Sequence, residues 1–274
     1  MRVAPVASVL LSLGLVGCMQ GPVREGSFDR TLNVSGKVML SVEDGAGNIV
    51  VHPGSDQKVT INARIRARGA FTGISGEEKV RRITANPPVS QSGNTIRITK
   101  PSDSALTRNV FIDYDITAPA QSQVSTFTGA GKIDIRGMLS PVEASSGAGA
   151  IIVEDLGDDA RVHTGAGNVD IRTARGRLDV ETGAGKITVR GEPKKDWRVS
   201  VGAGSVKLEL PADASLDLDA ETGMGKVRLA SDFQMTDASV STSRVRGTMG
   251  KGGPLVKVNN GAGSIEIARG MEQN

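Results

Sequence analysis

Hydrophobic and polar positions alternate around a Gly-X-Gly motif that recurs along the chain. In seven copies, apolar residues stand four and six places after the first glycine, with a mostly polar residue between them. The fourth place holds Ile133, Ile151, Val169, Ile187, Val206, Val227 and Ile265, and the sixth holds Ile135, Val153, Ile171, Val189, Leu208, Leu229 and Ile267. This alternation predicts β-strands with one buried face.

In the strand before each motif, the apolar residues stand at odd distances from the first glycine, whereas after the motif they stand at even distances. Valine stands three places before the first glycine at Val162, Val180, Val199 and Val258, and a charged residue stands four places before it at Arg161, Asp179, Arg198 and Lys257. The chain must therefore turn a corner at the motif, which glycine permits by accepting positive φ and close backbone approach. We expect the middle alanine to point into the interior. The predicted structural turns are Gly45, Gly47, Gly129, Gly131, Gly147, Gly149, Gly165, Gly167, Gly183, Gly185, Gly202, Gly204, Gly223, Gly225, Gly261 and Gly263.

The spacing of the motifs predicts the fold class. From Gly129 onward the intervals are 18, 18, 18, 19, 21 and 38 residues, and "STSRVRG" near Ser241 is interpreted as a degenerate copy inside the last interval. A period of 18 to 21 residues is typical of one coil per repeat. We therefore predict an all-β, single-domain parallel β-solenoid (β-helix), with regular repeats over residues 121–270 and a tail at 271–274.

The first two motifs start 84 residues apart, and the intervening segment departs from the repeat. "QKVTINARIRARG", "GNTIRITKP" and "NVFIDYDITAP" alternate as strands. "GISGEEKVRRITANPP" predicts a short helix near residues 75–85, capped by Ser75 and stopped before Pro87. Residues 29–120 are thus predicted to form N-terminal solenoid coils with a helical insert.

The N-terminus "MRVAPVASVLLSLGLVGC" is typical of an export signal, with Arg2 before a short apolar run. "LVGC" resembles the bacterial lipobox, which predicts a signal peptide at 1–17, lipidation of Cys18 and a polar tether at 18–28. Cys18 is the only cysteine. Met19 after it resembles the outer-membrane-directed pattern of such lipoproteins. The alternative is an ordinary signal peptide with an incidental cysteine.

Composition and motifs argue against several classes of function, namely the binding of nucleic acids, nucleotides and metal ions. Aromatic residues make up 3% of the 274 residues and the net charge is +3, so no nucleic-acid partner is expected. "TGAGKI" at 128–133 and 182–187 and "TGMGKV" at 222–227 lack the Ser or Thr that follows the lysine of a phosphate-binding loop. The turns also lack the third glycine of a dinucleotide site and the aspartate of calcium-binding repeats. No cofactor and no metal site are predicted.

Two repeated sets of side chains, one outward and one inward, could carry function. Arg136, Glu154, Arg172, Arg190 and Glu209 share one column, interpreted as a charge ladder rather than a ligand-binding stripe. Inward threonines before the turns (Thr128, Thr164, Thr182 and Thr222) predict a hydroxyl ladder.

The sequence contains few combinations of residues that are typical of a catalytic site. Asp113 and Asp115 form the best acidic pair, expected on the solvated face of a strand, and the two histidines are His52 and His163. Paired carboxylates on a β-helix occur in polysaccharide-cleaving enzymes, although this chain has few aromatic side chains to serve as sugar platforms. No catalytic residue is predicted.

The first "VMLSVEDGAGNIVVHPG" unit, the helical insert, "DYDITAPAQSQV" and the serial "TGAGKIDIRG"-type coils resemble the DUF4097 family over about residues 29–270. The resemblance implies a β-solenoid on exported or membrane-attached bacterial proteins, without established catalytic residues. The adhesin label of that family follows from architecture, and fold alone does not give function.

These observations together favour a lipid-anchored, non-catalytic binding or structural (adhesin-like) module of the cell envelope, on the outer membrane. The expected partners are the membrane, through the lipid, and envelope polysaccharide or another protein. A carbohydrate-active β-helix enzyme and an envelope-stress accessory lipoprotein that partners a membrane sensor remain alternatives.

Overall fold

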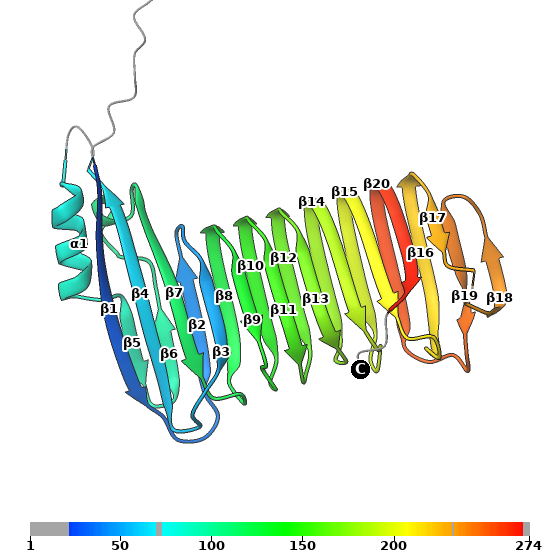
Figure 1. Ribbon diagram of the computed structural model, residues 1–274, viewed down its shortest axis with the longest axis horizontal. Helices are drawn as coiled ribbons and strands as arrows, with labels where there is room; N and C mark the ends of the chain where they lie inside the picture. The colour runs from blue at the N-terminus through cyan, green and yellow to red at the C-terminus, as the bar shows by residue number, and fades with distance from the viewer. Residues whose placement is uncertain (1–21, 70–72, 232, 271–274) are drawn as a thin grey trace, which may run out of the picture.

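The computed structural model describes residues 22–69, 73–231 and 233–270. The predicted signal peptide, Cys18 and the tail at 271–274 lie outside the described residues. The described chain is all-β apart from one α-helix and one 3₁₀ turn, and its strands stack along the long axis of the molecule (Figure 1).

The strands on either side of the Gly-X-Gly turns form two hydrogen-bonded ladders. Before the turns, the first ladder contains β2 (Met39–Asp44), β8 (Gln123–Ala130), β10 (Val142–Ala148) and β12 (Ala160–Ala166). After the turns, the second ladder contains β3 (Ile49–Pro53), β9 (Ile133–Arg136), β11 (Ile151–Leu156) and β13 (Val169–Ala174). Three longer strands pass through the turn and contribute to both ladders: β14 (Leu178–Gly191), β15 (Trp197–Leu210) and β20 (Leu255–Arg269).

Equivalent positions of successive coils lie directly beside one another. Ile151 pairs in parallel register with Ile133 and Val169, and Val169 pairs with Ile187. All four side chains are buried, as the alternating pattern predicts. Aliphatic columns of this kind fill the interior, and the single tryptophan, Trp197, is buried among them with its Nε1 donating to the Gly176 carbonyl.

The second glycine of each turn occupies a conformation and a space that no other residue fits. Gly185 has φ +145°, and a Cβ added there would lie 2.1 Å from the carbonyl oxygen of Gly167 on the neighbouring coil. Gly131 has the same relation to Gly47 at 2.0 Å. Because the obstacle is backbone rather than a movable side chain, the glycines allow coils to stack at the usual strand spacing of about 4.8 Å.

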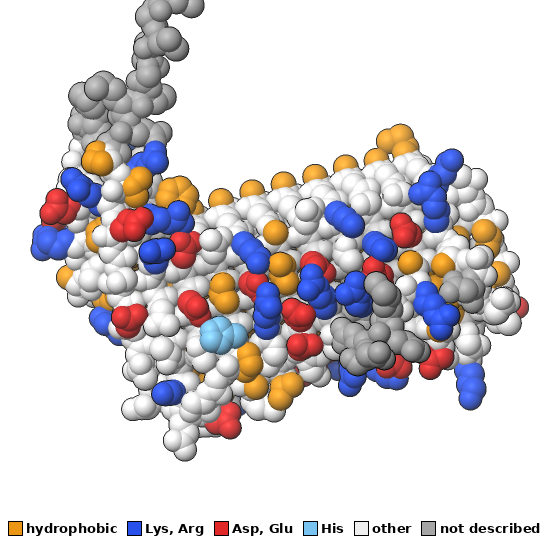
Figure 2. Space-filling view, in the orientation of Figure 1, with side chains coloured by type: hydrophobic (Ala, Val, Ile, Leu, Met, Phe, Trp, Pro, Cys, Tyr) orange, Lys and Arg blue, Asp and Glu red, His pale blue; other side chains and the backbone are white. Residues whose placement is uncertain are grey.

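The middle residue of the turn does not point inward, contrary to expectation. Ala130, Ala148, Ala166, Ala184 and Ala203 are exposed, and Figure 2 shows a row of small hydrophobic side chains along the upper edge of the stack. The inward side of the corner is occupied instead by the residue before the first glycine. These residues form the predicted hydroxyl ladder: Thr164 Oγ1 donates to the Gly149 carbonyl at 3.2 Å, and Thr128, Ser146, Thr182 and Thr222 repeat the contact on other coils.

Sequence order and spatial order differ at both ends of the stack. The last strand, β20, lies between β15 and the coil made of β16 (Leu216–Met224) and β17 (Val227–Leu229). At the other end β2 lies between β8 and β6 (Thr95–Ile98). The segment interpreted as a degenerate copy near Ser241 is not a coil, because β19 (Arg244–Met249) pairs antiparallel with β16.

Antiparallel strands close both ends, so the sheet is mixed and the prediction of a wholly parallel stack is wrong there. β1 (Val23–Asn33), β4 (Lys58–Arg68) and β7 (Val110–Ala118) run antiparallel in turn, as do β5 (Val89–Ser92) with β6 and β18 (Met235–Val240) with β19. β1 also corrects the predicted tether at 18–28. Its residues from Val23 onward pair with β4 instead of forming a loose polar segment.

The inserted helix forms where the sequence predicts it. α1 (Gly76–Ala85) begins after Ser75, whose side chain accepts a hydrogen bond from the Glu78 amide, and ends just before Pro87. It packs against β1 and β4 at one end of the stack (Figure 1). A 3₁₀ turn, η1 (Ser104–Leu106), interrupts the loop between β6 and β7.

Candidate functional site: a groove along the first ladder

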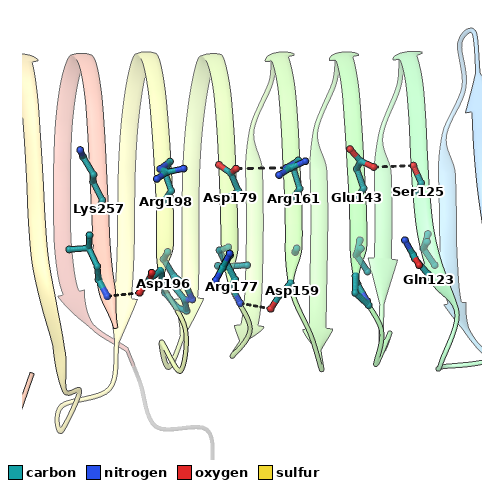
Figure 3. A pocket seen from close by; sticks show the side chains of 17 residues that line it. Gln123, Ser125, Glu143, Asp159, Arg161, Arg177, Asp179, Asp196, Arg198 and Lys257 are labelled. Atoms are coloured by element: carbon teal, nitrogen blue, oxygen red, sulfur yellow. Dashed lines mark hydrogen bonds and ion pairs between the residues drawn. The ribbon is translucent and has the colours of Figure 1, made fainter. Parts of the chain in front are cut away.

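A groove of about 530 Å³ runs along the outer side of the first ladder (Figure 3). Six successive coils contribute to it, each through the same two outward positions. One wall is the column Ser125, Glu143, Arg161, Asp179, Arg198 and Lys257. The other wall stands two residues earlier and consists of Gln123, Pro141, Asp159, Arg177, Asp196 and Leu255.

The strand alternation that builds the core also builds this groove. Between the two walls on each coil lies an inward residue, such as Val142, Leu178 or Trp197, whose side chain is buried. The groove floor is therefore β-sheet backbone, and the polar side chains on either side stand outward from it. Since the coils are in register, each wall is a straight row of side chains at strand spacing.

Several charges in the groove are already partnered. Arg161 and Asp179 form an ion pair at 3.8 Å, and Lys195 contacts Asp159 at 2.7 Å. Burial alone would raise the pKa of Asp159, but Lys195 and the amide of Arg177 outweigh it, so that pKa is lowered. A lowered pKa keeps Asp159 ionised near neutral pH and does not suit a general acid.

The charge column on the second ladder is an ion-pair ladder. Arg136 and Glu154 lie 3.5 Å apart, Glu154 and Arg172 3.9 Å, and Arg190 contacts Glu209. Figure 2 shows positive and negative side chains intermixed on this face of the stack. These pairs satisfy one another between coils, which supports the interpretation of this column as a stabilising ladder.

Asp113 and Asp115 lie on the solvated side of β7, as predicted, and each has a partner. Arg66 donates to Asp113 at 2.7 Å, while Nε2 of His52 lies 2.9 Å from Asp115 and 3.4 Å from the Thr117 hydroxyl. His52, Asp115 and Thr117 have the residue types of a hydroxyl–histidine–carboxylate triad. A triad needs both ring nitrogens of the histidine, and here both contacts are to Nε2.

The remaining predicted positions are dispersed along the stack. Lys132 pairs with Asp134 at 2.9 Å, while Lys186 and Lys226 are exposed on separate coils. His163 lies outside the groove, 3.6 Å from Glu181. Within the described ranges, no group of three or more His, Cys, Asp or Glu side chains could bind a metal ion. Across those same ranges, no helix has the length and apolar character needed to cross a membrane.

One buried acid stands out in the hydroxyl ladder. Asp44 occupies the place before Gly45 that threonine occupies in other coils, and it is 4% exposed with its Oδ2 atom unpaired. Burial raises its pKa to about 6, and nearby Asp113 adds to the effect. The amides of Gly45 and Ala46 act in the opposite direction but do not compensate.

Sequence reasoning identified the outward positions of the first ladder but not the groove. The column Glu143, Arg161, Asp179 alternates in sign and then ends in two cations, Arg198 and Lys257. The second-ladder column also holds two adjacent cations, Arg172 and Arg190, so the sequence alone does not distinguish the two columns. The difference is that Arg172 and Arg190 each have an acidic partner in the structure, Asp170 and Glu209. The second wall gives no periodic signal, because its residues share neither charge nor hydropathy.

Comparisons with known proteins identified similar solved structures and one sequence family. Two solved structures are similar: a candidate cell adhesion protein from Clostridium sporogenes (15% identity, 90% of this chain and 100% of that chain, TM-score 0.40) and a candidate adhesin from Bacteroides fragilis (14%, 88% and 97%, TM-score 0.41). No curated protein matches the chain. The sequence family described as Toastrack DUF4097 matches residues 38–268, which confirms the resemblance seen in the repeats. The chain belongs to the Toastrack DUF4097 family.

Proposed function

We propose that this protein is a lipid-anchored, non-catalytic binding module of the bacterial cell envelope whose groove binds a linear polymer lengthwise. The observation that carries the proposal is the repetition of the groove: six coils present the same two outward positions to one continuous hollow. A ligand that repeats along a line can make equivalent contacts on successive coils, and many weak contacts then add. A linear envelope polysaccharide suits such a surface better than a compact small molecule.

The rigidity of the stack supports this role. We infer that the central coils act as one parallel β-solenoid closed by antiparallel ends. Each central strand is hydrogen-bonded on both sides, and Trp197 packs directly beneath the groove. A preformed groove does not have to be ordered on binding, so little of the contact energy is lost to conformational entropy.

The proposed anchor would place the stack close to a membrane. Strand β1 begins at Val23, five residues after Cys18. Five residues of extended chain span at most about 17 Å, so a lipid on Cys18 would keep the β1 end of the stack near the bilayer. The outer membrane is the proposed location, and the groove would then be available to polymer on that side of the membrane.

The experiment blocks the groove chemically. Arg161→Cys places a thiol on the groove wall, and His163→Cys places one on the same strand outside the groove. Each is made in the full chain in a Cys18→Ser background and coupled to a bulky polyethylene glycol maleimide. Binding to a panel of soluble linear polysaccharides is then measured by calorimetry.

Blocking position 161 should abolish polysaccharide binding, and blocking position 163 should leave it intact. Equal binding by both conjugates, or no binding to any polysaccharide by the unmodified chain, would contradict the proposal. New reducing ends in the polymer after incubation would contradict its non-catalytic part and favour the carbohydrate-active alternative.

A further inference from the structure

The groove contains cations that the protein does not neutralise. Among the described residues, the side chains of Arg177, Arg198 and Lys257 make no ion pair within 4.0 Å. The contact of Arg177 with Asp159 is made by its backbone amide (Figure 3). All three side chains are exposed and line the same half of the groove.

Two of these cations are direct neighbours. Arg198 on β15 and Lys257 on β20 are register partners in the parallel ladder. Like charges opposite each other on adjacent strands destabilise a sheet. In the second ladder, Arg172 and Arg190 are also register partners, but each of them has an acidic partner, Asp170 and Glu209. The Arg198–Lys257 pair therefore costs stability without a compensating contact in the protein. Local conflicts of this kind are expected at functional sites.

The acids that could neutralise this pair are occupied elsewhere. Asp179, the register neighbour of Arg198, pairs with Arg161 at 3.8 Å. Asp219, the register neighbour of Lys257 on its other side, accepts two hydrogen bonds from Arg244 at 3.0 and 3.2 Å.

Asp196, which lines the groove next to this pair, also has a partner. Asp196 accepts a hydrogen bond from the Leu255 amide at 3.0 Å. The surrounding carboxylates thus have other partners, and the two cations remain available to a ligand.

We propose that Arg198 and Lys257, with Arg177 beside them, form an anion site for acidic groups repeated along a linear polysaccharide. The proposal rests on the proposed function and names the ligand class of the same groove. A guanidinium binds a carboxylate or phosphate through two parallel hydrogen bonds, and an ammonium adds a compact charge. One acidic group placed between coils would contact both side chains and relieve their repulsion. At the opposite end of the groove, the β8 coil presents the uncharged side chains of Gln123 and Ser125, which suit sugar hydroxyls.

The test compares two double variants that remove the same charge. Arg198→Gln/Lys257→Gln alters the proposed site. Lys226→Gln/Arg228→Gln removes two exposed cations of the β17 coil that lie outside the groove and have no ion pair among the described residues. Thermal unfolding checks that both variants fold. The probes are polygalacturonate, a linear phosphomannan, neutral dextran and vesicles containing phosphatidylglycerol.

The wild-type chain should bind polygalacturonate or phosphomannan more tightly than dextran, and the preferred acidic polysaccharide identifies carboxylate or phosphate as the recognised group. Arg198→Gln/Lys257→Gln should weaken that binding about tenfold or more, and the control variant less than twofold. Raising the salt concentration should weaken it further.

Each contrary result has a defined meaning. Equal losses in both variants, or equal binding of dextran and the acidic polymers, would overturn the anion site and leave the proposed groove function standing. Binding of no polymer would overturn both. Binding of the vesicles alone would overturn the anion site as a polysaccharide site and assign these cations to a lipid surface.

Discussion

Asp44 offers a quantitative test of how the corner of each coil is built. In five other coils, a hydroxyl before the first glycine donates to the carbonyl of a glycine in the adjacent coil, and in a further coil the Asn260 amide does the same at 3.0 Å to Gly204. An ionised carboxylate cannot donate a hydrogen bond. Its Oδ2 atom is buried without a partner, and the pKa of Asp44 is accordingly raised to about 6.

The sign of the pH dependence follows from the raised pKa. The ordinary value of 3.8 applies to the unfolded chain and about 6 to the folded one. Below about pH 4 both states are protonated, and Asp44 has no effect on stability. Between about pH 4 and pH 6 the unfolded chain loses the Asp44 proton while the folded chain retains it, so the free energy of unfolding falls as pH rises. The two pKa values differ by about 2, and each pKa unit corresponds to about 1.4 kcal/mol. Above pH 6 the free energy of unfolding is therefore lower by about 3 kcal/mol.

Asp44→Asn should remove this loss, because an amide at this position can donate to backbone as Asn260 does. The assay is urea unfolding at intervals from pH 4 to pH 8, for wild type, Asp44→Asn and the exposed control Asp56→Asn. Asp44→Asn should match the wild type near pH 4 and exceed its free energy of unfolding by about 2–3 kcal/mol at pH 7.5. A difference that does not change with pH, or a variant less stable than wild type at pH 7.5, would refute the reasoning.

Three other predictions concern the turns, the hydroxyl ladder and the anchor. Gly185→Ala should lower the free energy of unfolding by about 3 kcal/mol or more, because its Cβ would overlap backbone, whereas Lys186→Ala should change it by less than about 0.5 kcal/mol; equal effects in urea unfolding would contradict the corner assignment. Thr164→Val should cost about 1–2 kcal/mol, and Val201→Thr, which restores a hydroxyl where the ladder lacks one, should be neutral or stabilising in the same assay. Cys18→Ser should move the protein from the membrane to the soluble fraction of cells, and unchanged membrane retention would contradict the lipobox interpretation.

Features that depend on the repeat could be predicted from the sequence. The buried columns through Ile133 and Ile151, the hydroxyl ladder and the cap of α1 at Ser75 all follow from spacing and side-chain chemistry. Each involves either neighbouring residues or equivalent positions one period apart. The structure places them where the pattern predicts them.

Features that depend on the ends of the stack could not be predicted in this way. The position of β20 between β15 and β16 satisfies the same alternating pattern as a position at the end of the stack, so the pattern does not distinguish them. The groove was missed for a related reason. Its two walls are outward positions whose separate roles become visible only when the partners of Asp179 and Asp219 are known.

The most direct test of the groove as a polymer-binding site is the dependence of affinity on ligand length. Oligomers of the polysaccharide that binds best are titrated in increasing length against the wild-type chain. Six coils at strand spacing span about 24 Å, so affinity should rise with each added unit until the oligomer covers that distance and then level off. Affinity that is the same for the shortest and the longest oligomer would contradict lengthwise binding along the coils.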